Sequence, residues 1–161
     1  MIAVALIGCA SDPALEAWHG SVAVDSVARI DGACDEALVE VEPELPYLFV
    51  AVDRGVPDVA SLYWCEDPES CGVPFSSVWL TRLDEEEMTG ELGTASVDDD
   101  LCLVRWDDLA ATRDGDQVEI VVRTGQSTVL GVDATECADL VKAYLGDACN
   151  GVMEIRGTRV D

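Results

Sequence analysis

The chain has 161 residues, enough for one domain with a buried core, and 49% of them are hydrophobic, which excludes an intrinsically disordered chain. It carries 33 acidic against 9 basic residues, a formal net charge of -24. Because such a surface repels nucleic acids and anionic lipid head groups, we expect no nucleic-acid partner.

The first residues contain the candidate targeting signal. Residues 1–8 are uncharged and supply a short hydrophobic segment of the kind found in secretory signals. The end of this segment together with the following cysteine, Leu6-Ile7-Gly8-Cys9, resembles the lipobox of bacterial lipoprotein precursors. The resemblance implies cleavage before Cys9 and lipidation of its thiol, and the leader is shorter and less basic than in that family.

The lipobox resemblance also implies a domain plan and a location. Residues 1–8 are the signal segment, residues 9–17 are the lipidated cysteine and a tether, and residues 18–161 form a single β-rich domain. Ala10 instead of Asp after the cysteine implies transport to the outer membrane, so we expect a lipid-anchored protein of the cell envelope. The alternative is that residues 1–8 form a first strand and that Cys9 is a buried thiol.

Short runs of alternating apolar and polar residues, separated by turn residues, predict strands through most of the chain. In the clearest run Val118, Ile120 and Val122 share one face. The eight expected strands cover residues 18–30, 37–41, 47–54, 61–65, 77–83, 88–95, 101–106 and 117–124. A helix is expected within 133–146, because its apolar residues recur at helical spacing, and a final strand over 151–160.

This order of elements predicts a mainly β protein and resembles a lipocalin-like barrel, an eight-stranded antiparallel meander with a C-terminal helix and a final strand. A β-sandwich is the alternative. The family's Gly-x-Trp motif is not matched, but the resemblance implies that Arg123 stacks over Trp18 and closes one end of the barrel. A barrel of eight strands either holds one small ligand or is filled by its own side chains.

Six cysteines remain after Cys9, and an even number behind an export signal predicts disulfide bonds. Fifteen pairings are formally possible, and spacing alone only favours some of them. The favoured bridges are Cys65–Cys71, Cys137–Cys149 and Cys34–Cys102. With one histidine and no CxxC motif in the chain, we expect no metal site and no cofactor.

The residues that could act as catalysts, the single histidine and the acidic residues, do not belong to any known catalytic motif. His19 is the single histidine and is expected to be structural or at the surface. The acidic runs at 85–87, 98–100, 107–108 and at Asp114 and Asp116 are expected to be solvated hairpin tips, with Ca²⁺ binding as the alternative.

Aromatic residues provide the remaining candidates for a binding site. The tryptophans, Trp18, Trp64, Trp79 and Trp106, lie in or beside expected strands and are typical of a core. In a hollow barrel we expect Trp79 and Trp106 at the mouth, in contact with a ligand. The sequence therefore predicts a non-catalytic envelope lipoprotein that binds a small apolar ligand or another envelope protein. The alternatives are an interaction module with a filled core and a hydrolase that uses His19 or paired acids.

Overall fold

The computed structural model describes residues 12–32, 34, 36–98, 101–144 and 149–160, so the lipobox lies outside the described residues. Within these described ranges, two helices and nine strands follow one another. Their bounds are α1 Pro13–Trp18, β1 Gly20–Asp31, β2 Val39–Val41, β3 Tyr47–Asp53, β4 Val59–Asp67, β5 Ser70–Leu83, β6 Glu87–Asp98, β7 Leu101–Asp114, β8 Gln117–Leu130, α2 Ala134–Tyr144 and β9 Cys149–Val160.

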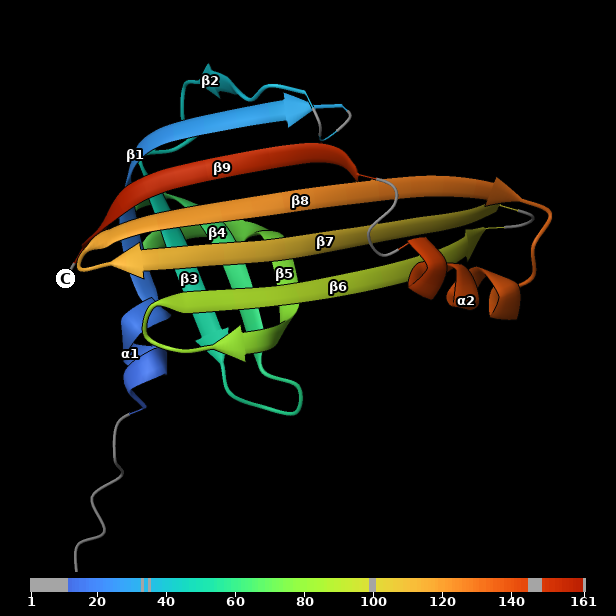
Figure 1. The fold of residues 1–161 in the computed structure, drawn as a ribbon, viewed down its shortest axis with the longest axis horizontal. Coiled ribbons are helices and arrows are strands. Elements are labelled where there is room, and N and C mark those ends of the chain that lie inside the picture. The colour runs from blue at the N-terminus through green and yellow to red at the C-terminus, as the bar shows by residue number, and fades with distance from the viewer. Residues whose placement is uncertain (1–11, 33, 35, 99–100, 145–148, 161) are drawn as a thin grey trace, which may run out of the picture.

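Eight of the strands close into an antiparallel barrel, as predicted, which excludes the β-sandwich (Figure 1). The strands β3 to β9 pair in chain order, and β1 joins β3 on one side and β9 on the other. The final strand is therefore part of the barrel wall, whereas the short strand β2 pairs only with β1 and lies outside the ring. At the β1–β9 seam the strands approach so closely that a Cβ at Gly157 would overlap the carbonyl oxygen of Ala23.

The barrel interior is filled by the apolar faces of these strands. Val118, Ile120 and Val122 point inward together, as the alternation in the sequence predicts. Leu48 and Leu62 from neighbouring strands are completely buried in the same cluster. Burial of each such side chain stabilises the fold by about 1.5–3 kcal/mol.

The helix α1 closes one end of the barrel, which we call the plugged end. Asp12 caps the helix, since its Oδ1 accepts a hydrogen bond from the Ala14 N–H at 3.1 Å, and Pro13 occupies a first-turn position. Trp18 is only 3% exposed, belongs to the core cluster and donates its indole N–H to the Asp84 carbonyl oxygen at 2.6 Å. The segment expected to be a tether, residues 9–17, is thus helical in its part from Pro13 onward.

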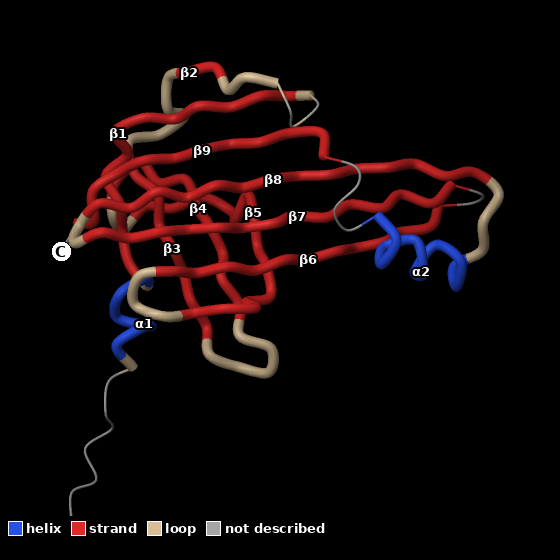
Figure 2. The backbone as a smooth tube through the Cα atoms, viewed as in Figure 1, coloured by secondary structure: helices blue, strands red, loops and turns tan. Residues whose placement is uncertain are grey.

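At the opposite end, β6, β7 and β8 continue beyond the barrel as a three-stranded ribbon, formed by residues 94–98, 101–105 and 126–130 (Figure 2). The helix α2 packs on one face of the ribbon, where Cys102, Val104 and Cys137 form a second small buried cluster. Neither described helix is long and apolar enough to cross a membrane.

The two faces of β7 belong to different hydrophobic clusters, one inside the barrel and one beneath α2. Leu109 and Ala111 point into the barrel, whereas Cys102 and Val104 point to α2. Their positions along the strand differ in parity, and the pairing of β7 with β6 and β8 has no register shift. Alternation in a strand therefore places these two pairs on opposite surfaces of one sheet.

Three disulfides are present, but only the local pair was predicted correctly. Cys65–Cys71 crosslinks β4 and β5, as the short spacing predicts. The other two pairings predicted from spacing are wrong, because the fold brings different cysteines together. The bridges are Cys34–Cys149, which ties the segment after β1 to the start of β9, and Cys102–Cys137, which ties β7 to α2.

Candidate ligand-binding site at the open end of the barrel

The end of the barrel opposite α1 contains a cavity of about 260 Å3, which we call the mouth cavity. It lies where β1 and β4 end, where β5 and β9 begin, and beside the middle of β8. Its apolar wall includes Trp64, Phe75, Val122 and Met153. The barrel is therefore plugged at one end and hollowed at the other.

An aromatic pair from neighbouring strands forms one side of the mouth cavity. The rings of Trp64 and Phe75 are stacked, with centroids 5.3 Å apart and planes 19° apart. The β4–β5 pairing shifts register between Leu62 and Tyr63, next to Trp64. The Cys65–Cys71 disulfide links the same two strands immediately beyond the pair. Two rings held on crosslinked strands form a pre-positioned apolar surface.

Charged side chains surround the opening of the mouth cavity. Arg29 lies 3.4 Å from a carboxylate oxygen of Asp31 and 3.8 Å from one of Glu44, measured from its guanidinium nitrogens. All three residues line the cavity. Because these carboxylates are exposed, each ion pair contributes at most about 1 kcal/mol to stability. Two acids against one base leave the rim with a formal negative charge.

A second cavity, of about 240 Å3, opens through the wall between β5 and β6, and we call it the side cavity. The β5–β6 pairing runs only from Leu83–Met88 to Trp79–Glu91, and beyond this point the two strands separate. The cavity is lined mainly by hydroxyl and charged side chains, which are Ser76, Ser77, Thr94, Arg105 and Asp107. The separation of the two strands thus creates a polar opening beside the mouth.

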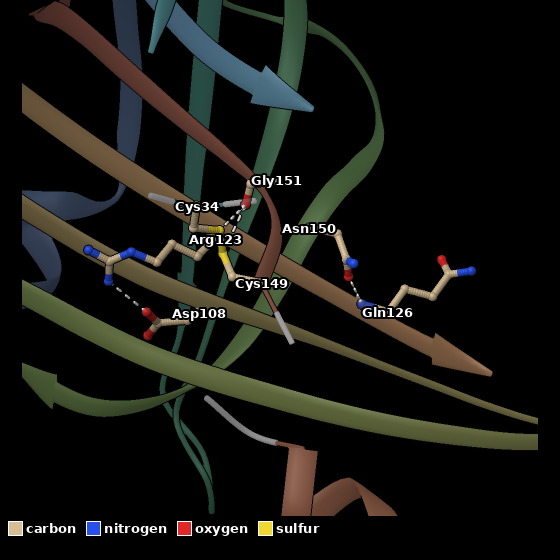
Figure 3. Close-up of a disulfide and its surroundings, with 7 residues drawn as sticks. All are labelled: Cys34, Asp108, Arg123, Gln126, Cys149, Asn150 and Gly151. Carbon is tan, nitrogen blue, oxygen red and sulfur yellow. Dashed lines mark hydrogen bonds and ion pairs between the residues drawn. A yellow bond between two sulfur atoms is a disulfide. The ribbon is translucent and has the colours of Figure 1, made fainter. Parts of the chain in front are cut away.

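Asp107 is the charged residue of the side cavity that sequence analysis placed incorrectly. It was expected in a solvated hairpin tip, but it lies in the middle of β7 and is only 7% exposed. Burial raises the pKa of the Asp107 carboxyl, and the nearby Arg105 guanidinium, 3.4 Å away, opposes that rise. The next residue, Asp108, faces outward and accepts a hydrogen bond from Arg123 at 3.2 Å (Figure 3).

The tryptophans expected at the mouth lie elsewhere. Trp79 is 54% exposed and stands beside Val78, whose side chain points into the barrel. Trp106 is buried on the same face of β7 as Val104, flanked by Gly93 and Gly125 on the adjacent strands.

The aromatic residues of the mouth are instead Trp64 and Phe75. Alternation along β4 places Trp64 on the inward face with Leu62, and this signal was available in the sequence. Phe75 follows irregular pairing in β5, which obscures its orientation in the sequence.

The predicted contact between Arg123 and Trp18 is replaced by other interactions. Arg123 points outward from β8, because its inward neighbours are Val122 and Thr124, and it pairs with Asp108. Two other arginines reach the helix at the plugged end. Arg113 donates to the Ala17 carbonyl oxygen at 2.9 Å, and Arg159 donates to the same oxygen and to that of His19.

His19 has a structural contact at the plugged end. Its Nδ1 accepts a hydrogen bond from the Val52 N–H at 3.1 Å, and its ring meets that of Phe49 edge-on with centroids 5.3 Å apart. His19 is therefore far along the barrel from the mouth cavity, because Val52 lies at the opposite end of β3 from the strand ends that form the mouth.

Fold and site together define a closed eight-stranded antiparallel barrel with one plugged end and one end hollowed by an amphipathic cavity. Comparison of the chain with protein-family models, with curated proteins and with solved structures finds no match.

Proposed function

We propose that this chain is a non-catalytic, lipid-anchored binding protein of the cell envelope that takes a small apolar ligand into the mouth cavity. The observation that carries the proposal is the stacked Trp64–Phe75 pair in the wall of that cavity. Binding sites for small molecules are concave and mostly apolar, with a few polar groups that fix orientation. The volume of about 260 Å3 lies just below the usual range for drug-sized ligands, which favours a small ligand or a partly enclosed one.

The position of α1 determines how an anchor at Cys9 would orient the barrel. Asp12, three residues after Cys9, is fixed to the barrel by its ion pair with Arg54, which also pairs with Asp58 at 2.5 Å. Three residues of extended chain span about 11 Å at most. An anchor at Cys9 therefore holds the plugged end close to the bilayer and leaves the mouth cavity facing away from it.

The binding function is tested with N-phenyl-1-naphthylamine, an uncharged apolar probe whose fluorescence rises in apolar surroundings. We expect saturable binding, and we expect Trp64→Ala and Phe75→Ala each to weaken it about tenfold, the equivalent of about 1.4 kcal/mol. Trp79→Ala is the matched control, because it removes an indole from the barrel exterior. Equal binding by all four proteins, or no binding by any, contradicts the proposal.

The anchor is tested separately by intact-mass measurement of the protein isolated from its native envelope. We expect a chain that begins at Cys9 and carries a diacyl or triacyl addition. The Cys9→Ser variant provides the control, since it removes the thiol that the lipid requires. An unmodified chain that begins at Met1 contradicts the anchor and leaves the binding test unaffected.

A further inference from the structure

We infer that the side cavity binds the ammonium group of an amphiphilic amine whose apolar part lies in the mouth cavity. The inference rests on the proposed function for the apolar part. Its own support comes from the polar side chains that surround Asp107.

The cavities at the open end are neighbours that share lining residues. Phe75 lines both the mouth cavity and the side cavity. A third hollow, of about 170 Å3, shares Thr124 with the mouth cavity and Arg105 with the side cavity. The mouth cavity and the side cavity are therefore neighbours at Phe75, and the proposed ligand places its apolar part and its ammonium group in adjacent hollows.

Asp107 lacks a close hydrogen-bond donor among the described residues. Both of its carboxylate oxygens lie 3.4 Å from the same Arg105 nitrogen, beyond the usual range for a charge-assisted hydrogen bond. It is also the single buried charged side chain among the described residues. A desolvated carboxylate with only long contacts gains stability from an additional cationic donor.

The other groups of the side cavity suit an ammonium ion. An ammonium has three N–H donors and no acceptor, so it requires several oxygen atoms around it. Ser76, itself buried, contributes a hydroxyl group, and Thr94, whose hydroxyl lies 3.5 Å from the Arg105 carbonyl oxygen, contributes a second from the strand that separates there. The Asp107 carboxylate and these two hydroxyl oxygens are therefore the acceptors for a bound ammonium, and Arg105 is the cation that shares the cavity with it.

Charge favours an amine over a fatty acid at this end of the barrel. The rim of the mouth cavity has Asp31 and Glu44 against Arg29, and the whole chain has a formal charge of -24. A carboxylate ligand would therefore approach against the field of the protein, whereas an ammonium is attracted by it. Comparing the affinity of an amine with that of an uncharged alcohol of the same chain length separates this electrostatic contribution from the contribution of alkyl-chain burial.

The test measures binding of 1-octylamine, 1-octanol and octanoate to the folded protein by isothermal titration calorimetry. We expect the amine to bind about tenfold more tightly than the alcohol, and octanoate to bind least. In the Asp107→Asn variant the amine and the alcohol should bind within about twofold of one another. Asp108→Asn is the matched control, because it removes the same charge from the adjacent residue on the outer face.

A second variant gives an expected change in the opposite direction. Arg105→Gln removes the cation beside Asp107 and should increase the preference for the amine over the alcohol. It keeps the inference testable if Asp107→Asn fails to fold.

The remaining outcomes distinguish failure of the side-cavity inference from failure of the mouth site. Equal loss of amine preference in Asp107→Asn and Asp108→Asn, or no preference in the unmodified protein, overturns the side-cavity inference. Failure of octanol and the naphthylamine probe to bind, with amine binding that depends on Asp107, overturns the mouth site and leaves the ammonium site at Asp107 standing. Absence of binding by all ligands overturns both.

Discussion

The two ends of the barrel are held together by different means. At the plugged end, Trp18 fills the interior, Arg113 and Arg159 donate to the carbonyl oxygen of Ala17, and Arg54 pairs with Asp12. At the open end lie all three disulfides, on the β4–β5 hairpin, at the start of β9 and between β7 and α2. Packing and polar contacts close one end, and covalent links restrain the other.

This difference follows from the hollows at the open end. A cavity deprives the side chains around it of packing contacts, so its walls gain less from dispersion and burial than a filled core does. Disulfides stabilise without filling space, because they restrict the unfolded chain. The open end thus keeps its cavities and gains stability from crosslinks outside them.

The largest expected effect comes from removing the disulfides one pair at a time. Because the bridges span 115, 35 and 6 residues of sequence, the chain-entropy relation predicts stability losses of about 4.8, 3.8 and 2.2 kcal/mol for Cys34–Cys149, Cys102–Cys137 and Cys65–Cys71. Paired Cys→Ser variants and urea unfolding measure the order. A reversed order would show that strain or residual structure outweighs loop length.

The plugged end provides the next largest effect. Trp18→Ala removes a buried ring and its hydrogen bond to Asp84, and should lower the free energy of unfolding by about 3–5 kcal/mol. Trp79→Ala, on the barrel exterior, should change it far less. If both variants lose the same stability in urea unfolding, the plug does not hold this end together.

Acid pH should affect the two ends in opposite directions, with the smallest changes in stability. At the plugged end, a hydrogen bond from Arg54 lowers the pKa of Asp12, and backbone N–H groups lower the pKa values of Asp58 and Asp84 below 3.8. These groups stabilise the fold above that pH, and their contribution is lost as the pH falls through their folded pKa values.

Asp107 at the open end has a raised pKa, so the sign is reversed. As the pH falls through its folded pKa toward 3.8, the native state binds a proton that the unfolded state does not, and stability rises. Urea unfolding as a function of pH should therefore show a small gain before the loss. Asp107→Asn should abolish the gain and keep the loss, and Asp12→Asn should reduce the loss; a gain that persists in Asp107→Asn assigns it to another group.

The sequence predicted the order of strands and helix because alternation and helical spacing are local signals. It missed α1, a helix of six residues that depends on the Asp12 cap and on packing of Trp18. It also ended the seventh strand at residue 106, where the acidic pair 107–108 interrupts the alternation. In the structure this strand continues to Asp114. The alternation is interrupted at 107–108 because the buried face of the strand changes at this point from the surface that contacts α2 to the surface that faces the barrel interior.

The candidate site was less predictable than the fold because its residues come from distant strands. Trp64 and Phe75 meet only when β4 and β5 pair with a shifted register. The separation of β5 from β6, which exposes Asp107 to a cavity, depends on how far each ladder extends. Disulfide partners are likewise determined by closure of the barrel, which brings Cys34 to Cys149 across 115 residues.

The placement of Trp106 and Asp107 on opposite surfaces of β7 makes this strand intolerant of insertion. The indole and the carboxylate are separated by a single peptide bond, and each faces a different environment. A shift of one position would turn every side chain of the strand to the other surface, with the indole in the polar opening and the carboxylate on the surface that carries Cys102 and Val104. The length of β7 is therefore as constrained as the identities of its residues.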